Sequence, residues 1–213
     1  MRPKPLLVAI VGGSGSGKTW LADKLCAKLG RKAARLSVDD FYRDRSHLSL
    51  KRRARINFDH PQAIDWASFE QVLAECLAGR RTGLPCYDFE THSRRKASKS
   101  FSPSPIILVD GLWLLHRRGV RKLFGASIFL KCGQATRLSR RLARDLLNRG
   151  RSAASVRQQF RLTVAPMHTR FVEPQVRWAQ LVIREIPTEC RVKKLAESLQ
   201  RQAKMLQSVG KHD

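Results

Sequence analysis

The chain has 213 residues, 42% hydrophobic and 28% charged, and its 42 Lys and Arg residues against 17 Asp and Glu give a net charge of +25. This length can bury enough surface for a core, and five cysteines without a Cys-x-x-Cys pair argue against a disulfide framework or a zinc site and fit a reducing compartment. Such a charge is typical of proteins that bind nucleic acid or a nucleoside triphosphate, but the Lys and Arg residues are spread along the whole chain, so we expect a solvated basic surface.

The first apolar run, residues 6–11, predicts a β-strand. It is too short to cross a membrane, and no signal-peptide cleavage pattern follows it. We therefore expect a cytoplasmic protein with no membrane partner.

The residues after this strand match the pattern G-x-x-x-x-G-K-[ST] and precede a helical pattern over residues 21–29. Strand, motif and helix together favour a phosphate-binding loop over a flexible Gly/Ser turn. The N–H groups of such a loop surround phosphate oxygens, Lys18 reaches the β- and γ-phosphates, and the Thr19 hydroxyl binds Mg²⁺. The predicted ATP-binding residues are Gly12, Gly13, Ser14, Gly15, Ser16, Gly17, Lys18 and Thr19.

Carboxylates follow the second predicted strand, residues 33–38, and a turn further along the chain. Asp39 lies at the carboxyl end of that strand, where open α/β sheets bind ligands, and could act as a general base or as a ligand of Mg²⁺. Asp39 or Asp40 could instead cap the next helix. Asp59 precedes His60 and a proline, and it could likewise cap the helix predicted over residues 67–77.

Residues 83–102 contain a proline and a polar stretch with aromatic residues, and they predict an inserted β-hairpin. The rings of Tyr87 and Phe89 could pack on a base, while the polar ends of Tyr87 and His92 hydrogen-bond its rim. A small satellite core is the alternative. The next predicted strand, residues 106–109, ends at Asp110, a carboxylate suited to bind Mg²⁺ directly or through water.

Residues 134–177 predict a long helical region with ten arginines, no lysine and two acids. Arginine without lysine favours bidentate recognition of phosphate over general solubility. We therefore expect a lid in which Arg144, Arg149 and Arg151 close on the phosphoryl group. The alternative is a solvated basic helix, and it applies to Arg137, Arg157, Arg161 and Arg170.

Further strands are predicted over residues 127–130 and 181–183, and further helices over residues 137–147 and 192–206. Short apolar strands that alternate with helices are typical of a parallel sheet covered on both faces. The fold class is therefore α/β, a doubly wound, mainly parallel five-stranded sheet within one domain, residues 1–213.

Four segments resemble the uridine–cytidine kinase family and occur in the family's order. They are Ser37–Tyr42, Asn57–Pro61, Tyr87–Arg94 and Arg140–Arg151, the last continuing to Gln159 and Pro166–Met167. The resemblance implies a P-loop kinase that transfers the γ-phosphate of ATP or GTP to the 5′-hydroxyl of uridine or cytidine, with Mg²⁺, and that forms a homotetramer.

The resemblance also implies roles for single residues. Asp39 is the catalytic base, and Lys18, Arg144, Arg149 and Arg151 act on the phosphates. Asp59 binds the ribose hydroxyls. The rest of the implied nucleoside site consists of Phe58, Tyr87, Phe89, His92, Arg141 and Gln159.

The chain departs from the family's pattern at four places. Asp110 stands where the family usually has glutamate, and Trp20 where it usually has a smaller residue. Residues 131–134 lack the family's acids and residues 184–187 lack its Arg-Gly-Gly turn, and both segments should border the base of the donor. Two other functions stay open: a related kinase of another acceptor, such as phosphoribulose or another ribonucleoside, and a basic nucleic-acid-dependent ATPase.

Overall fold

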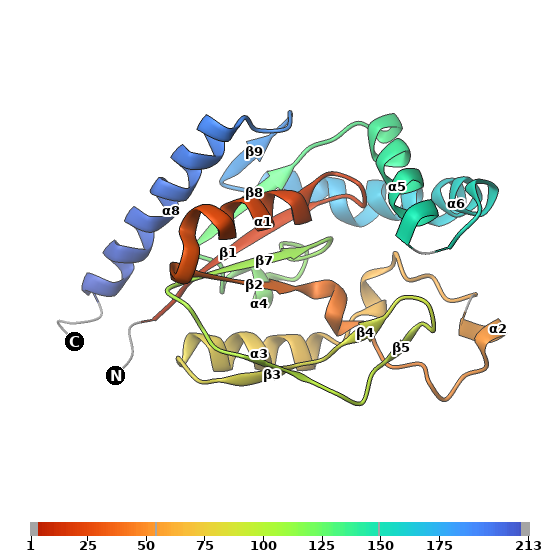
Figure 1. Ribbon diagram of the computed structural model, residues 1–213, viewed down its shortest axis with the longest axis horizontal. Helices are drawn as coiled ribbons and strands as arrows, with labels where there is room; N and C mark the ends of the chain where they lie inside the picture. The colour runs from red at the N-terminus through yellow and green to blue at the C-terminus, as the bar shows by residue number, and fades with distance from the viewer. Residues whose placement is uncertain (1–3, 54, 149, 210–213) are drawn as a thin grey trace.

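The computed structural model describes residues 4–53, 55–148 and 150–209, and its centre is a five-stranded sheet (Figure 1). The strands are β1 (Leu6–Gly12), β2 (Ala33–Ser37), β7 (Ile106–Gly111), β8 (Ala126–Leu130) and β9 (Leu181–Ile183). Their order is β2-β7-β1-β8-β9, and each neighbouring pair is parallel. All five predicted strands are confirmed, with ends that differ by at most two residues.

Helices cover both faces of this sheet (Figure 1). The α-helices are α1 (Lys18–Leu29), α2 (Leu50–Arg53), α3 (Trp66–Leu77), α4 (Arg118–Arg121), α5 (Gln134–Asn148), α6 (Ala153–Gln159), α7 (Ala165–Met167) and α8 (Glu189–Val209). Alternate residues of β1 enter separate cores, Leu6 and Val8 with α1 and α8, and Leu7 and Ala9 with α3. The doubly wound α/β fold is therefore confirmed. Within the described ranges, no helix is both long and apolar enough to span a membrane.

The residues that cap the helices are not the aspartates that the sequence analysis offered as alternatives. Ser37 caps the short helical turn Val38–Phe41, because its hydroxyl accepts a hydrogen bond from the backbone N–H of Asp39 at 3.3 Å. Asp65 caps α3 by accepting from Ser68 N–H at 3.2 Å. The capping alternatives for Asp39, Asp40 and Asp59 are therefore wrong, since side chains closer to each helix start fill those positions.

The inserted segment forms two nested antiparallel pairs, of which the outer passes α3 and the inner lies beyond the end of α3, toward α2 (Figure 1). The outer pair is β3 (Thr82–Leu84) with β6 (Lys99–Phe101), and the inner pair is β4 (Tyr87–Asp88) with β5 (Ser93–Arg94). Arg94 fixes the inner pair to the segment after β2, because its Nε donates to the carbonyl of Tyr42 at 2.8 Å and its Nη2 pairs with Asp65 at 3.2 Å. The hairpin is thus held where β2 ends.

Helix α5 turns its arginines inward. Arg137 and Arg141 are 3% and 6% exposed, whereas Leu146 and Leu147 are 45% and 83% exposed. The solvated-helix alternative is therefore wrong for Arg137. Arg157, Arg161 and Arg170 are exposed, as that alternative requires for them. The inversion arises because α5 lies over the polar phosphate-binding loop and not over the apolar sheet.

Candidate functional site

The loop between β1 and α1 winds around its own backbone N–H groups. Gly15 and Gly17 have φ values of 81° and 94°, a left-handed conformation that glycine adopts without strain. A Cβ on Gly15 would lie 2.3 Å from the carbonyl oxygen of Arg137, so the close approach of α5 also requires glycine there. Lys18 is 8% exposed, and its burial lowers the pKa of the ammonium while Asp39 and Asp110 raise it. The loop is thus a cradle for an anion, with a buried cation beside two carboxylates.

Thr19 and Asp110 lie together at the carboxyl ends of the central strands. The Thr19 hydroxyl donates to Asp110 Oδ2 at 3.1 Å, and Arg35 Nε donates to Asp110 Oδ1 at 2.9 Å. Arg35, which also pairs with Asp23 at 2.8 Å, was not singled out in the sequence. It stands in β2 directly beside the Asp110 strand, a register that only the sheet order reveals.

These oxygens fit Mg²⁺. The described residues contain no cluster of three His, Cys, Asp or Glu side chains that could enclose a metal ion. Mg²⁺ does not need one, because it commonly uses one or two protein oxygens together with substrate phosphates and waters. Thr19 is within hydrogen-bond reach of a carboxylate that is 1% exposed, and Arg35 keeps that carboxylate in place.

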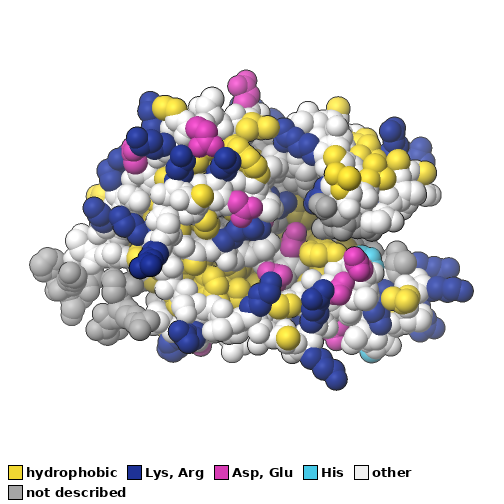
Figure 2. Space-filling model, in the orientation of Figure 1, with side chains coloured by type: hydrophobic (Ala, Val, Ile, Leu, Met, Phe, Trp, Pro, Cys, Tyr) yellow, Lys and Arg dark blue, Asp and Glu magenta, His cyan; other side chains and the backbone are white. Residues whose placement is uncertain are grey.

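A pocket of about 70 Å³ gathers the predicted acceptor residues. It lies beside the phosphate-binding loop, and Figure 2 shows this face of the molecule hollowed between α5–α6 and the hairpin. The predicted residues that line it are Ser14, Lys18, Asp39, Phe58, Asp59, Tyr87, Phe89, His92, Arg141, Arg144, Arg151 and Gln159. Arg149 lies outside the described residues. Tyr42 and Leu112 also line the pocket and were missed.

Aromatic rings form one wall of this pocket. The ring of Phe58 stacks on that of His92 at 4.6 Å and 13°, and the ring centroid of Tyr42 lies 5.0 Å from that of Tyr87. Tyr42 donates its hydroxyl to the carbonyl of Phe58 at 3.1 Å, whereas the buried Tyr87 hydroxyl has no hydrogen-bond partner among the described residues. Burial raises the pKa of both tyrosines, so both are neutral phenols at physiological pH. The Tyr87 hydroxyl can therefore donate to a ligand or accept from it.

In contrast to the aromatic wall, Asp59 contributes a buried carboxylate to the pocket, close to α5. Its Oδ2 accepts from the Thr163 hydroxyl at 3.4 Å, and its Oδ1 lies 4.0 Å from Arg141 Nη1. Burial raises the pKa of Asp59, while Arg141 and Thr163 act to lower it. Arg141 also donates to Ser14 Oγ and Gln159 Oε1, each at 2.9 Å, so one guanidinium connects the phosphate-binding loop, Asp59 and α6.

Asp145 is a fully buried carboxylate that the sequence analysis did not single out. It pairs with Arg144 Nη2 at 2.8 Å, with Arg141 Nε at 3.4 Å and with Arg151 Nη1 at 4.0 Å. One acid thus orients three arginines that line the pocket. The two acids among ten arginines were visible in the sequence, and the spacing of four from Arg141 to Asp145 could have indicated the pair.

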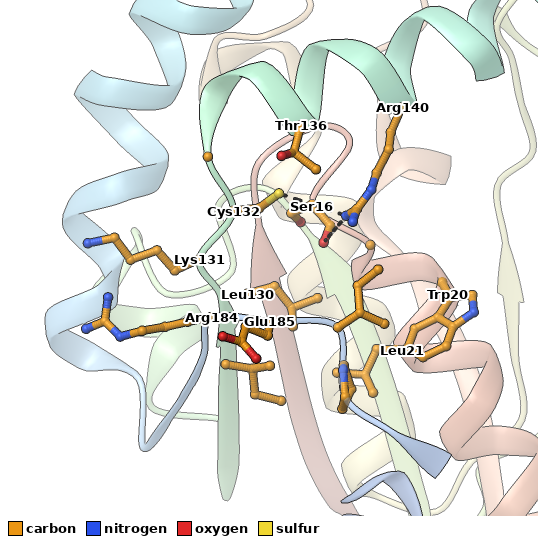
Figure 3. A pocket seen from close by; sticks show the side chains of 15 residues that line it. Ser16, Trp20, Leu21, Leu130, Lys131, Cys132, Thr136, Arg140, Arg184 and Glu185 are labelled. Carbon is orange, nitrogen blue, oxygen red and sulfur yellow. Dashed lines mark hydrogen bonds between the residues drawn. The ribbon is translucent and has the colours of Figure 1, made fainter.

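A second pocket, of about 650 Å³, lies on the α1 side of the phosphate-binding loop (Figure 3). Residues 131–133 after β8 and 184–187 after β9 line it, together with Ser16, Gly17, Trp20 and Arg140. Arg140 Nη1 points at the loop and lies 3.5 Å from the carbonyl oxygens of Gly15 and Ser16. The two departing segments that the sequence analysis assigned to the donor's surroundings therefore share one pocket with the loop.

Comparisons with known proteins agree with this arrangement. The sequence matches the model of the Phosphoribulokinase / Uridine kinase family over residues 7–191. It is 36% identical over 186 residues to a uridine kinase of Clostridium tetani, covering 87% of this chain and 89% of that protein. It is 38% identical over 183 residues to a uridine kinase of Chloroflexus aggregans, covering 85% and 88%.

Solved structures share the fold at lower sequence identity. Phosphoribulokinase from Rhodobacter spheroides has a TM-score of 0.62 at 16% identity, covering 91% of this chain and 75% of that one. D-glycerate 3-kinase from Cryptococcus neoformans has a TM-score of 0.61 at 20% identity, covering 90% and 88%. Since the family match spans most of the sequence, the chain belongs to the Phosphoribulokinase / Uridine kinase family.

Proposed function

We propose that the protein is a uridine kinase that transfers the γ-phosphate of ATP or GTP to the 5′-hydroxyl of uridine or cytidine, a reaction of pyrimidine salvage. The main observation behind the proposal is the small pocket beside the phosphate-binding loop. Lys18, Asp39 and Asp59 line this pocket together with several aromatic rings. Relatives named uridine kinase at 36% and 38% identity support it.

The donor is proposed to lie across the phosphate-binding loop, with its phosphates at Gly12–Thr19 and its base in the 650 Å³ pocket. Thr19 and Asp110 would hold Mg²⁺, with Asp39 as a further candidate ligand. When bound, this ion neutralises charge on the β- and γ-phosphates. Lys18 supplies a positive charge from the protein itself, in a buried place where its interaction with phosphate is strong.

Asp39 is proposed to accept the proton of the attacking hydroxyl. Its carboxylate lines the same pocket as Lys18, at the carboxyl end of β2, so a hydroxyl held between them faces the phosphate-binding loop. Arg144 and Arg151, with Arg149, would stabilise the charge that develops on the transferring group. Asp145 orients Arg144 and Arg151 for that task.

The nucleoside is proposed to bind between Asp59 and the aromatic wall. Asp59 would accept hydrogen bonds from the ribose hydroxyls, while Arg141 and Gln159 hold the sugar's other side. Tyr87 and His92 would bond the rim of the pyrimidine, between the rings of Phe58 and Phe89. A cavity of about 70 Å³ holds only a few water molecules, so the side chains that line it must shift to admit a nucleoside.

Other acceptors and partners are less well supported. The likeness to phosphoribulokinase is a fold likeness at 16% identity, whereas the relatives named uridine kinase are more than twice as similar in sequence. Lys and Arg side chains are scattered over the face in Figure 2 and form no continuous strip for nucleic acid. We also propose, from the family resemblance, a cytoplasmic homotetramer, which light scattering of the purified protein would test.

An acceptor screen tests the proposed function. ADP or GDP release would be measured with uridine, cytidine, adenosine, guanosine, ribulose 5-phosphate and single-stranded RNA. We expect uridine and cytidine to react within about tenfold of each other, because neutral imidazole and phenol groups can each donate or accept. His92→Ala should weaken both pyrimidines together. A preference for a purine nucleoside or ribulose 5-phosphate, or RNA-stimulated hydrolysis, would contradict the proposal.

A further inference from the structure

Trp20 is an exposed aromatic side chain at the edge of the larger pocket. It is 39% exposed and lines the 650 Å³ pocket, whereas Trp66 and Trp113 are 5% and 0% exposed. A single exposed ring needs no explanation by itself. This ring, however, follows the phosphate-binding loop directly in α1 and shares its pocket with Ser16 and Gly17 of that loop.

The pocket that Trp20 lines, called the slot below, combines an indole ring, apolar side chains and basic side chains. Figure 3 shows Trp20 on one side, Lys131 and Arg184 on the opposite side, and Leu21 and Leu130 between them. Given the proposed function, on which this inference rests, the donor's phosphates at the loop place its base in this slot. We propose that the Trp20 indole stacks on the purine base of the donor, and that it strengthens donor binding without selecting between adenine and guanine.

One contact from outside the pocket restrains the indole. The Lys24 ammonium lies 5.9 Å from the centroid of the Trp20 ring and pairs with Glu189 at 2.8 Å. Lys24 follows Trp20 by one helical turn and is not among the residues that line the pocket. The cation therefore restrains the ring without filling the slot, and less rotamer freedom is lost when a base binds.

The lack of purine selection follows from the exposure of the charged side chains that line the pocket after β8 and β9. Lys131, Arg184 and Glu185 all lie in contact with solvent. Strong discrimination requires buried polar groups that the wrong base leaves unpaired, and exposed groups can bond to water instead. Stacking on an aromatic face tolerates any base.

Binding measurements on Trp20 variants test the inference. The dissociation constants of ATP, GTP and inorganic tripolyphosphate, which has no base, would be measured by calorimetry without nucleoside. Trp20→Ala should weaken ATP and GTP by about 5- to 150-fold each, the effect of losing about 1–3 kcal/mol of base stacking. Trp20→Phe should restore most of the affinity, and tripolyphosphate should bind all variants alike. Met205→Ala, at an exposed α8 residue outside the pocket, should behave as wild type.

Three outcomes would overturn the stacking: wild-type ATP affinity in Trp20→Ala, an equal loss for tripolyphosphate, or a loss for only one of the two purine nucleotides. The proposed function fails separately. Suppose that Trp20→Ala loses ATP affinity while the wild-type protein phosphorylates no pyrimidine nucleoside. That result would support the stacking and contradict the proposed pyrimidine nucleoside acceptor.

Discussion

Two adjacent carboxylates after β2 lie in different surroundings, so a variant of one serves as the control for the same variant of the other. Asp39 lines the acceptor pocket and Asp40 does not, while burial raises the pKa of Asp40. Asp39→Asn should lower kcat by about 10²–10⁴, the usual contribution of a positioned base, with ATP and uridine affinities near those of wild type. Asp40→Asn should keep most turnover. A larger loss of kcat in Asp40→Asn than in Asp39→Asn would assign the base to the other residue.

The buried Asp59 carboxylate predicts discrimination between sugars. A 2′-deoxynucleoside removes one donor and leaves this carboxylate less well paired in a water-poor site. Hydrogen bonds to charged groups contribute about 1.5–3 kcal/mol, so deoxyuridine should have a kcat/KM about 10- to 150-fold below that of uridine. Asp59→Ala should narrow this ratio, which steady-state kinetics with both nucleosides measures. Equal rates with the two nucleosides in wild type would exclude Asp59 from the ribose site.

Individual residues were predictable where a local motif carried them. Lys18, Thr19 and Asp39 each stand in a short pattern tied to the end of a strand, so the fold alone brings them together. Arg35 was missed because its partner lies in the neighbouring strand β7, and Asp145 was missed because it stands among many arginines. Arg35 pairs with a residue 75 positions away, and no local pattern encodes such a contact.

Within helix α5, the arrangement of the arginines depends on Asp145. Asp145→Asn keeps the shape but leaves Arg141, Arg144 and Arg151 without a common counter-charge. A displacement of catalytic groups by about 1 Å can lower the rate about 100-fold. We therefore expect kcat to fall by about 10- to 100-fold. ATP affinity should change less than kcat, and Asp145→Glu should recover part of the loss. Arg157→Ala, at an exposed α6 residue, is the control. Unchanged kcat in a folded Asp145→Asn protein would contradict this role.

The segment His168–Val172 packs against the phosphate-binding loop and predicts a pH effect on stability. A Cβ on Gly13 would lie 2.7 Å from His168 Nδ1, and burial together with Arg137 lowers the pKa of His168 to about 4. Unfolded histidine has a pKa of about 6.5, so between these values the unfolded chain binds more protons than the native protein. Stability from this residue is therefore lost as the pH falls from about 6.5 to about 4.

Thermal unfolding tests this effect. The melting temperature of His168→Gln should fall less between pH 7 and pH 5 than that of wild type, since the substituted side chain does not titrate. His47→Gln, at an exposed loop residue, is the matched control and should follow wild type. Parallel curves for wild type and His168→Gln would show that His168 is not the responsible group.

Regular elements were predictable because their patterns are local. The buried strands are continuous apolar runs, and their ends were found within two residues. The hairpin was located, but its division into two nested pairs depends on the Arg94 contacts with Tyr42 and Asp65. Helix α5 was also predicted, yet which of its faces is buried depends on its position over the phosphate-binding loop.

Considered as a whole, the protein carries far more positive than negative charge, so salt should change its stability. Two electrostatic effects compete. Salt weakens favourable surface pairs such as Lys24–Glu189 and Arg80–Glu75, which lie exposed to solvent and contribute little to stability. Salt also screens the repulsion among positive charges that a net charge of +25 leaves unbalanced. Because the excess of like charges outnumbers the surface pairs, we expect the repulsion to dominate.

The melting temperature should therefore rise as potassium chloride increases from about 0.01 M to about 0.15 M, a range over which the screening length falls from about 30 Å to about 8 Å. Replacing Lys193 and Lys194 of α8 by glutamate lowers the net charge by four at exposed positions that line neither of the two pockets described above. This variant should melt at a higher temperature than wild type in low salt and show a shallower rise with salt. A melting temperature that falls on adding salt would mean that specific ion pairs, and not the overall repulsion, control the stability of the fold.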